Sequence, residues 1–325
     1  MLDFTFCQVD KTANYGGSDK KRGIFYNDAR YMLKMSDRIR EDKRNDWNSS
    51  YTNSAFSEYL GCHIIASIGL NVQETLLGTM TLISSMGIPR IYPVVACKNF
   101  VPDGYSLVEF KNIENALLDH KAPKIPKIVD VYAVFTNDNP YFSGSFAREA
   151  LANYWDIFIV DALLGNFDRH ANNWGYLINN QTQKMEAAPI YDCGSCLYPQ
   201  LADDSLEHII SNQDEIQMRI DKFPLAALEG LDGRKVSYKT YINSLVNDDC
   251  TEALQRIFPK INMGVIDSII DETEGLSDLR RNFYKVMLHA RYSQILESAY
   301  TKLQADGFRP VSYTHLRAHE TDQYL

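Results

Sequence analysis

The sequence lacks a hydrophobic run long enough to span a bilayer, which takes about 20 apolar residues. Its first residues, MLDFTFCQVDK, contain neither a positively charged start nor an apolar stretch, so we expect no signal peptide. Its six cysteines show no regular spacing, which argues against a disulfide framework and fits a reducing compartment. Together these absences predict a cytoplasmic protein that does not contact membranes.

The sequence also lacks an excess of positive charge. Its formal net charge is −9, whereas a dedicated nucleic-acid-binding surface is basic. The most basic stretch, residues 20–44, is interleaved with aspartate and glutamate, which favours a mixed and solvated face. We therefore expect no direct contact with nucleic acid.

The first hundred residues predict a small sheet with one helix, in a chain of 325 residues whose 45% hydrophobic content is enough for a sizeable core. The segments GIFYND and RYMLKM predict two strands around a turn at Asn27-Asp28. Residues 54–68 carry apolar side chains at three- and four-residue spacings, which predicts a helix that ends at Gly69. Three further strands are expected over residues 71–80, 81–86 and 91–100.

After Pro102 the pattern becomes helical. Residues 146–164 predict a long, buried helix that ends at Gly165, and amphipathic helices follow residue 201, the last of them over residues 276–305. We therefore predict an α+β protein with a sheet-containing N-terminal lobe over residues 1–99, a larger and mostly helical lobe over residues 100–310, and a hinge at residues 96–103.

The last residues, 311–325, show no helical stripe. They resemble the translation of a sequencing adapter, so we expect this tail to be non-native and without function. On that interpretation His315 and His319, four residues apart, are not a zinc-binding pair.

The most informative segment is residues 165–197. Asp168 and Asn173 lie five residues apart directly after the buried helix, and Asp192 follows a predicted hairpin made of WGYLIN, NQTQK and MEAAPIY. Phosphoryl transfer needs a carboxylate beside the acceptor hydroxyl and metal ions that bridge the phosphates. Protein kinases supply these groups with the same spacing and order, in the catalytic loop and the D-F-G motif. Each residue alone could cap a turn or lie in a surface loop, but the ordered set favours a magnesium-dependent phosphotransferase, because oxygen ligands suit Mg²⁺.

The residues D-R-H-A-N-N followed by Y-D resemble the HipA-like serine/threonine kinases, whose catalytic loop reads D-x-H-x-x-N before a YD metal motif. The likeness runs from about residue 14 to at least residue 199, and it is strongest with the short forms of the cell-translocating kinase A type. It implies a bilobal protein-kinase-like fold, use of ATP and Mg²⁺, autophosphorylation and a protein substrate. Phosphoinositide kinases also use D-R-H-x-x-N, so this motif is more specific for the superfamily than for the family.

The nucleotide-binding residues of that family have matches near the N-terminus. Gly16, Gly17 and Ser18 precede the first strand, where a glycine-rich turn would cover the phosphates, although two glycines also suit a simple hairpin turn. Lys34 lies inside a hydrophobic strand and is expected to reach the α- and β-phosphates. A buried lysine needs a partner, and Glu58 on the following helix is the expected one. The alternatives are an edge-strand lysine and a solvent-facing glutamate.

Two further groups of site residues follow from the resemblance. The hinge segment VVACKNF is expected to bind adenine through its backbone near Cys97, Lys98 and Phe100, and backbone recognition leaves no side-chain signature. In the catalytic loop, Asp168 is expected to accept the hydroxyl proton, and His170 matches the histidine of the family's loop, which supports that loop by packing and hydrogen bonding.

A C-x-x-C motif, Cys193 to Cys196, elsewhere indicates redox or zinc chemistry. No second such motif and no βαβ pattern accompany it. Its position directly after Asp192 makes the metal-binding loop the simpler explanation.

Three functions stay open. The first is a protein serine/threonine kinase. The second is a lipid or small-molecule kinase, which the absence of lysine and arginine from residues 193–207 disfavours for an anionic headgroup. The third is a nucleotide-binding pseudokinase, whose usual mark is the loss of the ATP lysine, the catalytic aspartate or the metal-binding aspartate, and none of these is missing here.

The resemblance also leaves open a toxin or effector role, secretion without a signal peptide, and a small DNA-binding antitoxin as partner. The short forms lack the subdomain through which HipA proteins contact such a partner, so that contact does not carry over.

Overall fold

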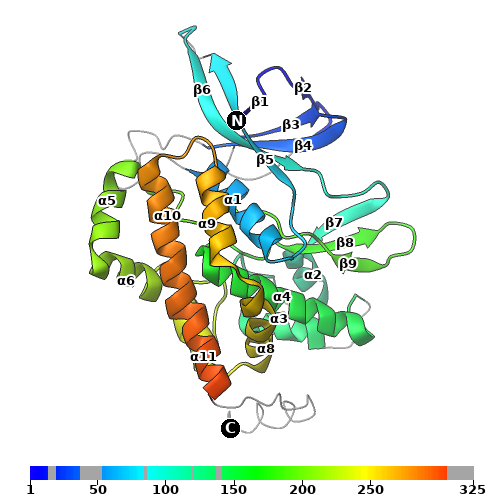
Figure 1. The fold of residues 1–325 in the computed structure, drawn as a ribbon. Helices are drawn as coiled ribbons and strands as arrows, with labels where there is room; N and C mark the ends of the chain where they lie inside the picture. The colour runs from blue at the N-terminus through cyan, green and yellow to red at the C-terminus, as the bar shows by residue number, and fades with distance from the viewer. Residues whose placement is uncertain (14–19, 37–52, 84–85, 119–120, 137–140, 306–325) are drawn as a thin grey trace.

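The computed structural model describes residues 1–13, 20–36, 53–83, 86–118, 121–136 and 141–305. A six-stranded sheet of order β1-β5-β6-β4-β3-β2 lies at one end of the molecule and helices fill the other (Figure 1). The strands are β1 (Leu2–Asp3), β2 (Gln8–Val9), β3 (Lys20–Tyr26), β4 (Ala29–Met35), β5 (Thr75–Ile83) and β6 (Pro89–Lys98). The predicted phosphate-covering residues Gly16, Gly17 and Ser18, and the tail after residue 305, lie outside the described residues.

The hairpin predicted around Asn27-Asp28 is confirmed. β3 and β4 pair antiparallel from Lys20 opposite Met35 to Tyr26 opposite Ala29. Asn27 and Asp28 have φ angles of 47° and 59°, the left-handed conformation that a tight two-residue hairpin requires and that asparagine and aspartate tolerate. The two strands expected over residues 71–80 and 81–86 were wrong as separate elements: β5 is one strand that pairs with β6 without a break from Thr75 to Ile83. Neither Met80 nor Thr81, where the two expected strands met, is a residue typical of turns, so nothing in the sequence interrupts the strand there.

One helix, α1 (Ser54–Ser67), lies between the six-stranded sheet and the helical part of the molecule, as predicted (Figure 1). Its Leu60, Ile64 and Ile65 are fully buried in the main hydrophobic core. The opposite face of the sheet has a small core of its own, which includes Phe4 and Leu33. The sheet is therefore covered by apolar side chains on both faces, and α1 connects it to the rest of the chain.

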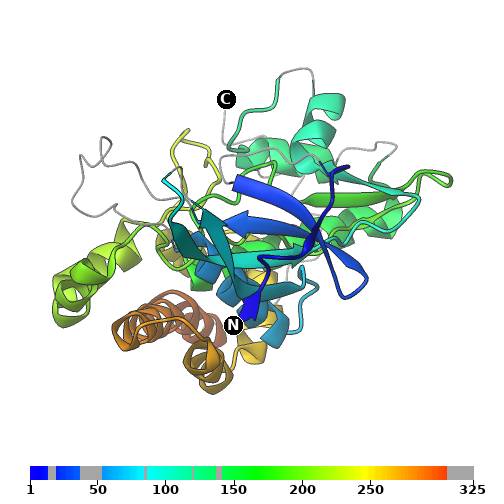
Figure 2. The same ribbon diagram turned by 90° about the horizontal axis from the view of Figure 1, so that it is seen from above.

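The helical part begins with a second, three-stranded sheet of order β7-β8-β9, made of β7 (Tyr105–Glu109), β8 (Gly175–Asn179) and β9 (Met185–Ala187). The predicted hairpin after the catalytic loop is confirmed as β8 and β9, whereas β7 was not predicted. Figure 2 shows this sheet on the side of the molecule opposite to α5 and α6. The helices are α2 (Phe110–Leu117), α3 (Ile128–Thr136), α4 (Gly144–Leu164), α5 (Asp203–Ser211), α6 (Gln213–Asp221), α7 (Tyr238–Ser244), α8 (Asp248–Ile257), α9 (Met263–Glu272), α10 (Asp278–Arg291) and α11 (Ser298–Ala305).

Two features of the long helices bear on the prediction. α4 is the expected buried helix, and Gly165 ends it in the left-handed conformation, with φ of 66°, which glycine adopts without strain. The long helix expected over residues 276–305 is confirmed as an unbroken helical run from Asp278 to Ala305, made of α10, a π-helical segment at Tyr292–Glu297 and α11. No helix among the described residues is both long enough and apolar enough to cross a membrane.

Candidate active site

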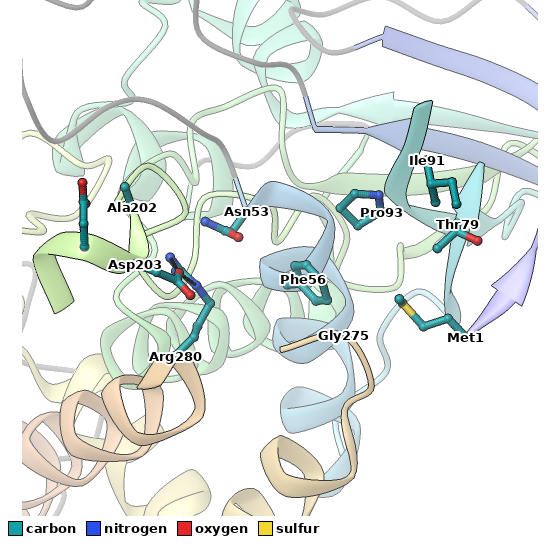
Figure 3. A pocket seen from close by; sticks show the side chains of 11 residues that line it. Met1, Asn53, Phe56, Thr79, Ile91, Pro93, Ala202, Asp203, Gly275 and Arg280 are labelled. Carbon is teal, nitrogen blue, oxygen red and sulfur yellow. Dashed lines mark hydrogen bonds and ion pairs between the residues drawn. The ribbon is translucent and has the colours of Figure 1, made fainter. Parts of the chain in front are cut away.

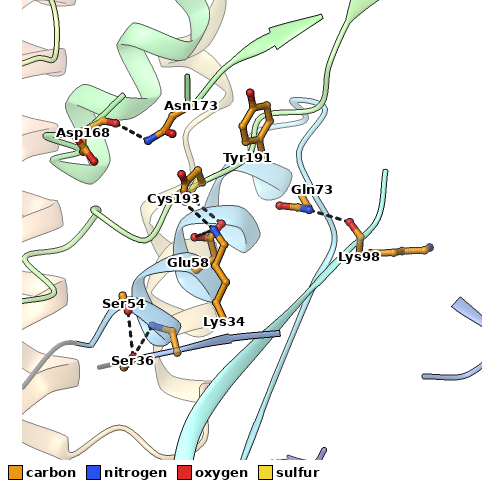
Figure 4. Close-up of polar contacts among 12 residues, drawn as sticks. Lys34, Ser36, Ser54, Glu58, Gln73, Lys98, Asp168, Asn173, Tyr191 and Cys193 are labelled. Atoms are coloured by element: carbon orange, nitrogen blue, oxygen red, sulfur yellow. Dashed lines mark hydrogen bonds and ion pairs between the residues drawn. The ribbon is translucent and has the colours of Figure 1, made fainter. Parts of the chain in front are cut away.

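The buried lysine of β4 is held by two carboxylates from different parts of the chain. Lys34 Nζ donates to Glu58 Oε2 at 2.8 Å and to Asp192 Oδ1 at 2.9 Å. The side chains of Lys34 and Glu58 are 6% and 0% exposed. Figure 4 shows Lys34 extending from the sheet toward Glu58 on α1. The predicted pairing of Lys34 with Glu58 is confirmed, and both alternatives, an edge-strand lysine and a solvent-facing glutamate, are excluded.

Side chains along β4 alternate between the two faces of the sheet, and this places Lys34 on the face next to α1. Leu33 points to the small core on the outer face, so Lys34 points to the opposite face, toward α1. Its neighbours on that face include the fully buried Val95 and Cys97 of β6. An ammonium group in such surroundings is stable only with charged partners.

Burial and pairing act in opposite directions on the pKa values of this group. For Lys34, burial lowers the pKa, but Glu58 and Asp192 outweigh it and hold the pKa well above the usual value. For Asp192, burial raises the pKa, and the Lys34 ammonium more than offsets that and brings it down to about 2. Burial raises the pKa of Glu58, against the attraction of Lys34. At neutral pH Lys34 and Asp192 are therefore both charged.

The loop that carries Asp192 is fixed against α1. The backbone amide of Cys193 donates to Glu58 Oε1 at 3.1 Å, so the two oxygens of Glu58 hold the lysine and this loop at once. Asp192 has a φ of 59°, in the left-handed region that non-glycine residues rarely adopt, and such conformations cluster at functional sites. On α1, a Cβ atom at Gly61 would come within 2.8 Å of the Cβ of Cys193. Gly61, which the sequence did not single out, therefore allows this close approach.

The catalytic loop follows Gly165 and closes on itself through side chains. Asp168 N donates to Asn166 Oδ1 at 3.1 Å, and Asn173 Nδ2 donates to the carbonyl oxygen of Asp168 at 2.8 Å (Figure 4). The Asp168 side chain remains 39% exposed. It has Lys124 Nζ at 3.6 Å and His170 Nε2 at 3.7 Å from its two oxygens. A carboxylate with this exposure is accessible to a hydroxyl group of another molecule.

Arg169 connects the two loops through its side chain. Its guanidinium, 6% exposed, forms a two-pronged ion pair with Asp161 of α4, at 2.9 and 3.1 Å. It also donates to the carbonyl oxygens of Asn173, at 2.9 Å, and Tyr191. Planar guanidinium groups suit such two-pronged contacts. Asp161, eight residues before the arginine, was the available signal, but it is the only charged residue in the apolar run from Ile157 to Leu164.

His170 lies beside Asp168 and is 12% exposed. Its Nδ1 accepts a hydrogen bond from the backbone amide of Asn172 at 3.3 Å. Burial lowers the pKa of His170, and although Asp168 opposes this, the pKa stays below its usual value. The imidazole is therefore neutral near pH 7, and its contacts are those of a residue that supports the loop.

The residues predicted to hold a metal ion, Asn173 and Asp192, offer an amide oxygen and an ionised carboxylate. The Nδ2 group of Asn173 is engaged with the Asp168 carbonyl, which leaves its Oδ1 for a cation. Within the described residues, no three histidine, cysteine, aspartate or glutamate side chains gather around one point. Mg²⁺ is commonly held by one or two protein oxygens, with waters and substrate phosphates in its other positions. The donor set fits such an ion.

The predicted hinge residues make contacts within the protein. Lys98 N donates to the Glu74 carbonyl oxygen at 2.9 Å, and its own carbonyl oxygen accepts from Gln73 Nε2 at 2.8 Å (Figure 4). Both main-chain groups of Lys98 are thus engaged within the protein. The ring of Phe100 stacks on that of Tyr191, with 5.5 Å between centroids, and joins the hinge to the residue before Asp192. Adenine binding near Cys97, Lys98 and Phe100 stays a prediction.

The C-x-x-C motif is buried. Cys193 and Cys196 are both fully buried free thiols, and Cys196 N donates to the Cys193 carbonyl oxygen at 3.0 Å within the loop after Asp192. They pack against Gly61 of α1. The motif therefore belongs to the packing of this loop.

A cavity of about 510 Å³ lies elsewhere, beside the start of α1 (Figure 3). It is lined by Asn53 and Phe56 near the start of α1, by Arg280 of α10 and by residues of β5 and β6, among others. None of the predicted site residues lines it. The Arg280 guanidinium is occupied by Asp203 and by the Leu201 carbonyl oxygen.

Comparisons with known proteins identify the family of this chain. The family model described as the HipA-like C-terminal domain matches residues 14–256. The serine/threonine-protein kinase CtkA of Helicobacter pylori is 40% identical over 304 residues, covering 93% of this chain and 88% of CtkA.

Solved structures also resemble this one. A crystal structure of the proinflammatory kinase CtkA of Helicobacter pylori superposes with a TM-score of 0.84 at 38% identity, over 95% of this chain and 99% of that one. HipA of Shewanella oneidensis, solved with HipB and its operator DNA, shares the fold at a TM-score of 0.50 and 14% identity, over 90% of this chain and 67% of that one. The bilobal α+β kinase fold predicted from the sequence is confirmed, and the chain belongs to the HipA-like family of protein kinases.

Proposed function

We propose that this chain is an ATP- and Mg²⁺-dependent serine/threonine kinase that phosphorylates a protein substrate and itself. The observation that carries the proposal is the buried pair of Lys34 and Glu58, joined by the partly exposed Asp192, which lies beside a loop that leaves Asp168 exposed. One part fits the phosphates of a nucleotide, and the other fits an incoming hydroxyl group.

Each residue has one role in the proposed transfer. Lys34 binds the α- and β-phosphates, and Glu58 keeps its ammonium in place. Asp192 and Asn173 hold Mg²⁺, which when bound neutralises charge on the phosphate oxygens. Asp168 accepts the proton of the substrate hydroxyl while the hydroxyl oxygen bonds to the γ-phosphorus and the bond from that phosphorus to ADP breaks.

The acceptor is proposed to be a protein because the relative CtkA carries the name of a serine/threonine-protein kinase. A lipid headgroup is disfavoured, since residues 193–207, after the metal-binding aspartate, contain no lysine or arginine. A toxin role and a small DNA-binding antitoxin as partner are further proposals. They rest on the HipA-like family membership, and a neighbouring gene for a helix-turn-helix protein would support them.

The test is phosphoryl transfer from radiolabelled ATP with Mg²⁺, to the protein itself and to proteins of a cell lysate. We expect the wild type to label itself and at least one lysate protein, on serine or threonine. Asp168→Ala and Asp192→Asn should each reduce labelling about 10³-fold or more, because catalytic groups that act as a unit have effects of this size. The exposed Asp271, paired with Lys285 on the surface, provides the control Asp271→Asn, which should label normally.

Thermal unfolding of the variants separates loss of chemistry from loss of fold. Asp168→Ala should unfold at the wild-type temperature, because this side chain is exposed and its ion pair with Lys124 is a surface contact. Full labelling by Asp192→Asn would contradict the assignment of the metal-binding residue. A wild-type protein that binds ATP but transfers no phosphate would instead support the pseudokinase alternative.

A further inference from the structure

Lys124 lies beside the proposed base without belonging to the catalytic loop. It comes from the connection between α2 and α3, more than forty residues earlier in the sequence than Asp168. Its Nζ is 3.6 Å from Asp168 Oδ1, and its side chain is 64% exposed. No sequence motif marked it.

The backbone around Lys124 is held on both sides, so the position of this lysine is set by the fold. Its carbonyl oxygen accepts a hydrogen bond from Ala171 N of the catalytic loop at 3.2 Å. Before it, Ala122 is buried and its amide donates to Asn115 Oδ1 at 2.7 Å. After it, the carbonyl oxygen of Pro126 accepts from Glu229 N at 3.0 Å. The chain therefore brings the start of this side chain to the catalytic loop.

Among the described residues, three other cations act at the site. Lys21 lies opposite Lys34 in the β3–β4 pair and, together with Lys34, lowers the pKa of Asp192, so it serves the nucleotide side. The other two are held by buried partners. Lys34 is buried between Glu58 and Asp192. Arg169 is buried with Asp161 and two carbonyl oxygens. Arg169 is also the one lysine or arginine in the catalytic loop, residues 165–173. Lys124, in contrast, has an exposed side chain whose ammonium contacts the exposed carboxylate of Asp168.

A cation at this place would assist the proposed chemistry. In the proposed reaction the carboxylate of Asp168 lies next to a hydroxyl that attacks a phosphoryl group, and both the carboxylate and the phosphoryl oxygens are negative. The carboxylate and the phosphoryl oxygens would therefore repel each other at close range. In phosphoryl transfer, catalysis depends largely on neutralising the charge on the transferring group, which basic side chains do in related reactions.

We propose that Lys124 is a catalytic residue that contacts the oxygens of the transferring phosphoryl group, an inference that rests on the proposed function. The acceptor oxygen forms its bond to the γ-phosphorus, the bond to the leaving ADP oxygen breaks with its electron pair, and the acceptor proton passes to Asp168. Lys124 keeps its own protons throughout and offsets the negative charge on the oxygens that are not exchanged. Its exposed side chain is free to turn from Asp168 toward the phosphoryl group.

The test compares three variants. Lys124→Met removes the charge, Lys124→Arg retains it, and Lys127→Met is the matched control, because Lys127 is an exposed lysine three residues further along the same connection. Single-turnover transfer measures the rate. Binding of Mg²⁺–ADP with and without aluminium fluoride, a mimic of the transferring phosphoryl group, measures the contact without any turnover.

We expect Lys124→Met to slow transfer about 10²- to 10³-fold, the loss typical of one donor aimed at developing charge. Its affinity for Mg²⁺–ADP should stay within about twofold of the Lys127→Met value, while the gain in affinity from aluminium fluoride falls by a factor similar to the loss in rate. Lys124→Arg should recover part of both. Melting temperatures of the two methionine variants should agree, since an exposed ion pair contributes little to stability.

Three results would overturn the proposal. One is a Lys124→Met enzyme as fast as Lys127→Met. Another is a slow enzyme that keeps the full gain from aluminium fluoride, which would make Lys124 a positioning residue for Asp168 only. The last is a melting temperature well below that of the control, which would assign a structural role. If the wild type transfers phosphate to no protein, the proposed function fails, and the aluminium fluoride measurement still decides the contact.

Discussion

Two ion pairs, one in each region of the proposed active site, differ in burial. On the nucleotide side, Lys34 and Glu58 are 6% and 0% exposed, with 2.8 Å between their charged atoms. On the acceptor side, Asp168 and Lys124 are 39% and 64% exposed, with 3.6 Å between theirs. The first region is fixed before any substrate binds, whereas the second is loosely paired and open to solvent. A small nucleotide is the same in every turnover and can be bound by rigid groups. A hydroxyl group on another protein needs a more accessible site.

The difference in burial predicts different effects of substitutions on stability and on activity. Charges buried with their partners cost several kcal/mol when one partner is removed, because the other is left uncompensated. Exposed pairs contribute about 0–1 kcal/mol. Substitutions on the nucleotide side should therefore lower both the stability and the rate, and substitutions on the acceptor side should lower the rate alone.

The largest effect on stability is expected at Asp161, which anchors the arginine between the two regions. Asp161→Asn leaves the buried Arg169 guanidinium without its counter-ion. We expect the free energy of unfolding to fall by about 3–5 kcal/mol, as for other broken buried pairs. Chemical denaturation monitored by circular dichroism measures it.

The same helix supplies the control. Asp156 of α4 also pairs with an arginine, Arg256, at 2.9 Å, but that arginine is 37% exposed. Asp156→Asn should cost only about 0.2–1 kcal/mol. Equal losses in the two variants would show that burial does not distinguish the pairs.

Asp161 also shows where sequence reasoning stopped. The order of Lys34, Glu58, Asp168, Asn173 and Asp192 was readable because each lies in a local pattern: a strand, a helix, a loop of fixed spacing and a hairpin. The structure confirms that Lys34, Glu58 and Asp192 meet.

Residues that come together only through the tertiary fold left no local pattern in the sequence. The pairing of Asp161 with Arg169 depends on how a loop folds back on its own helix. Lys124 lies in a connection between helices, and β7 joins β8 across more than sixty residues of chain. Periodicity describes one element at a time, and these contacts link separate elements.

Glu58→Gln is expected to have the next largest effect on stability. Glutamine keeps the shape and can still accept from one donor, but it removes the charge between Lys34 and the Cys193 amide. We expect a loss of about 1–3 kcal/mol, the cost of leaving a buried polar partner poorly satisfied. Transfer should slow about 10²-fold, since a displaced Lys34 misplaces the nucleotide.

A second glutamate–lysine pair, where β5 begins and β6 ends in the same sheet, serves as the comparison. Glu74 and Lys98 are 2.7 Å apart but are 71% and 39% exposed. Glu74→Gln should leave the free energy of unfolding within about 1 kcal/mol of the wild type. Glu58→Gln with wild-type stability and rate would contradict the structural role of the buried pair.

The smallest effect is expected at His170, which lies between the two regions in exposure. Burial lowers its pKa most strongly, Asp168 and Asp192 oppose this, and Lys124 adds to it, so its folded-state pKa lies below the unfolded value of about 6.5. The unfolded chain then binds more protons than the folded one between these two pKa values, and stability rises with pH in that window. The contribution of a neutral His170 is therefore complete above about pH 6.5 and is lost as the pH falls through the folded-state value.

His170→Asn keeps an acceptor for the Asn172 amide but cannot titrate, so its unfolding free energy should fall less than that of the wild type between pH 7 and pH 5. Denaturant unfolding of both proteins at several pH values measures the difference, in which all other titrating groups cancel. Parallel curves would mean that His170 titrates alike in the folded and unfolded chains, and that the acceptor side is open enough to hydrate it fully.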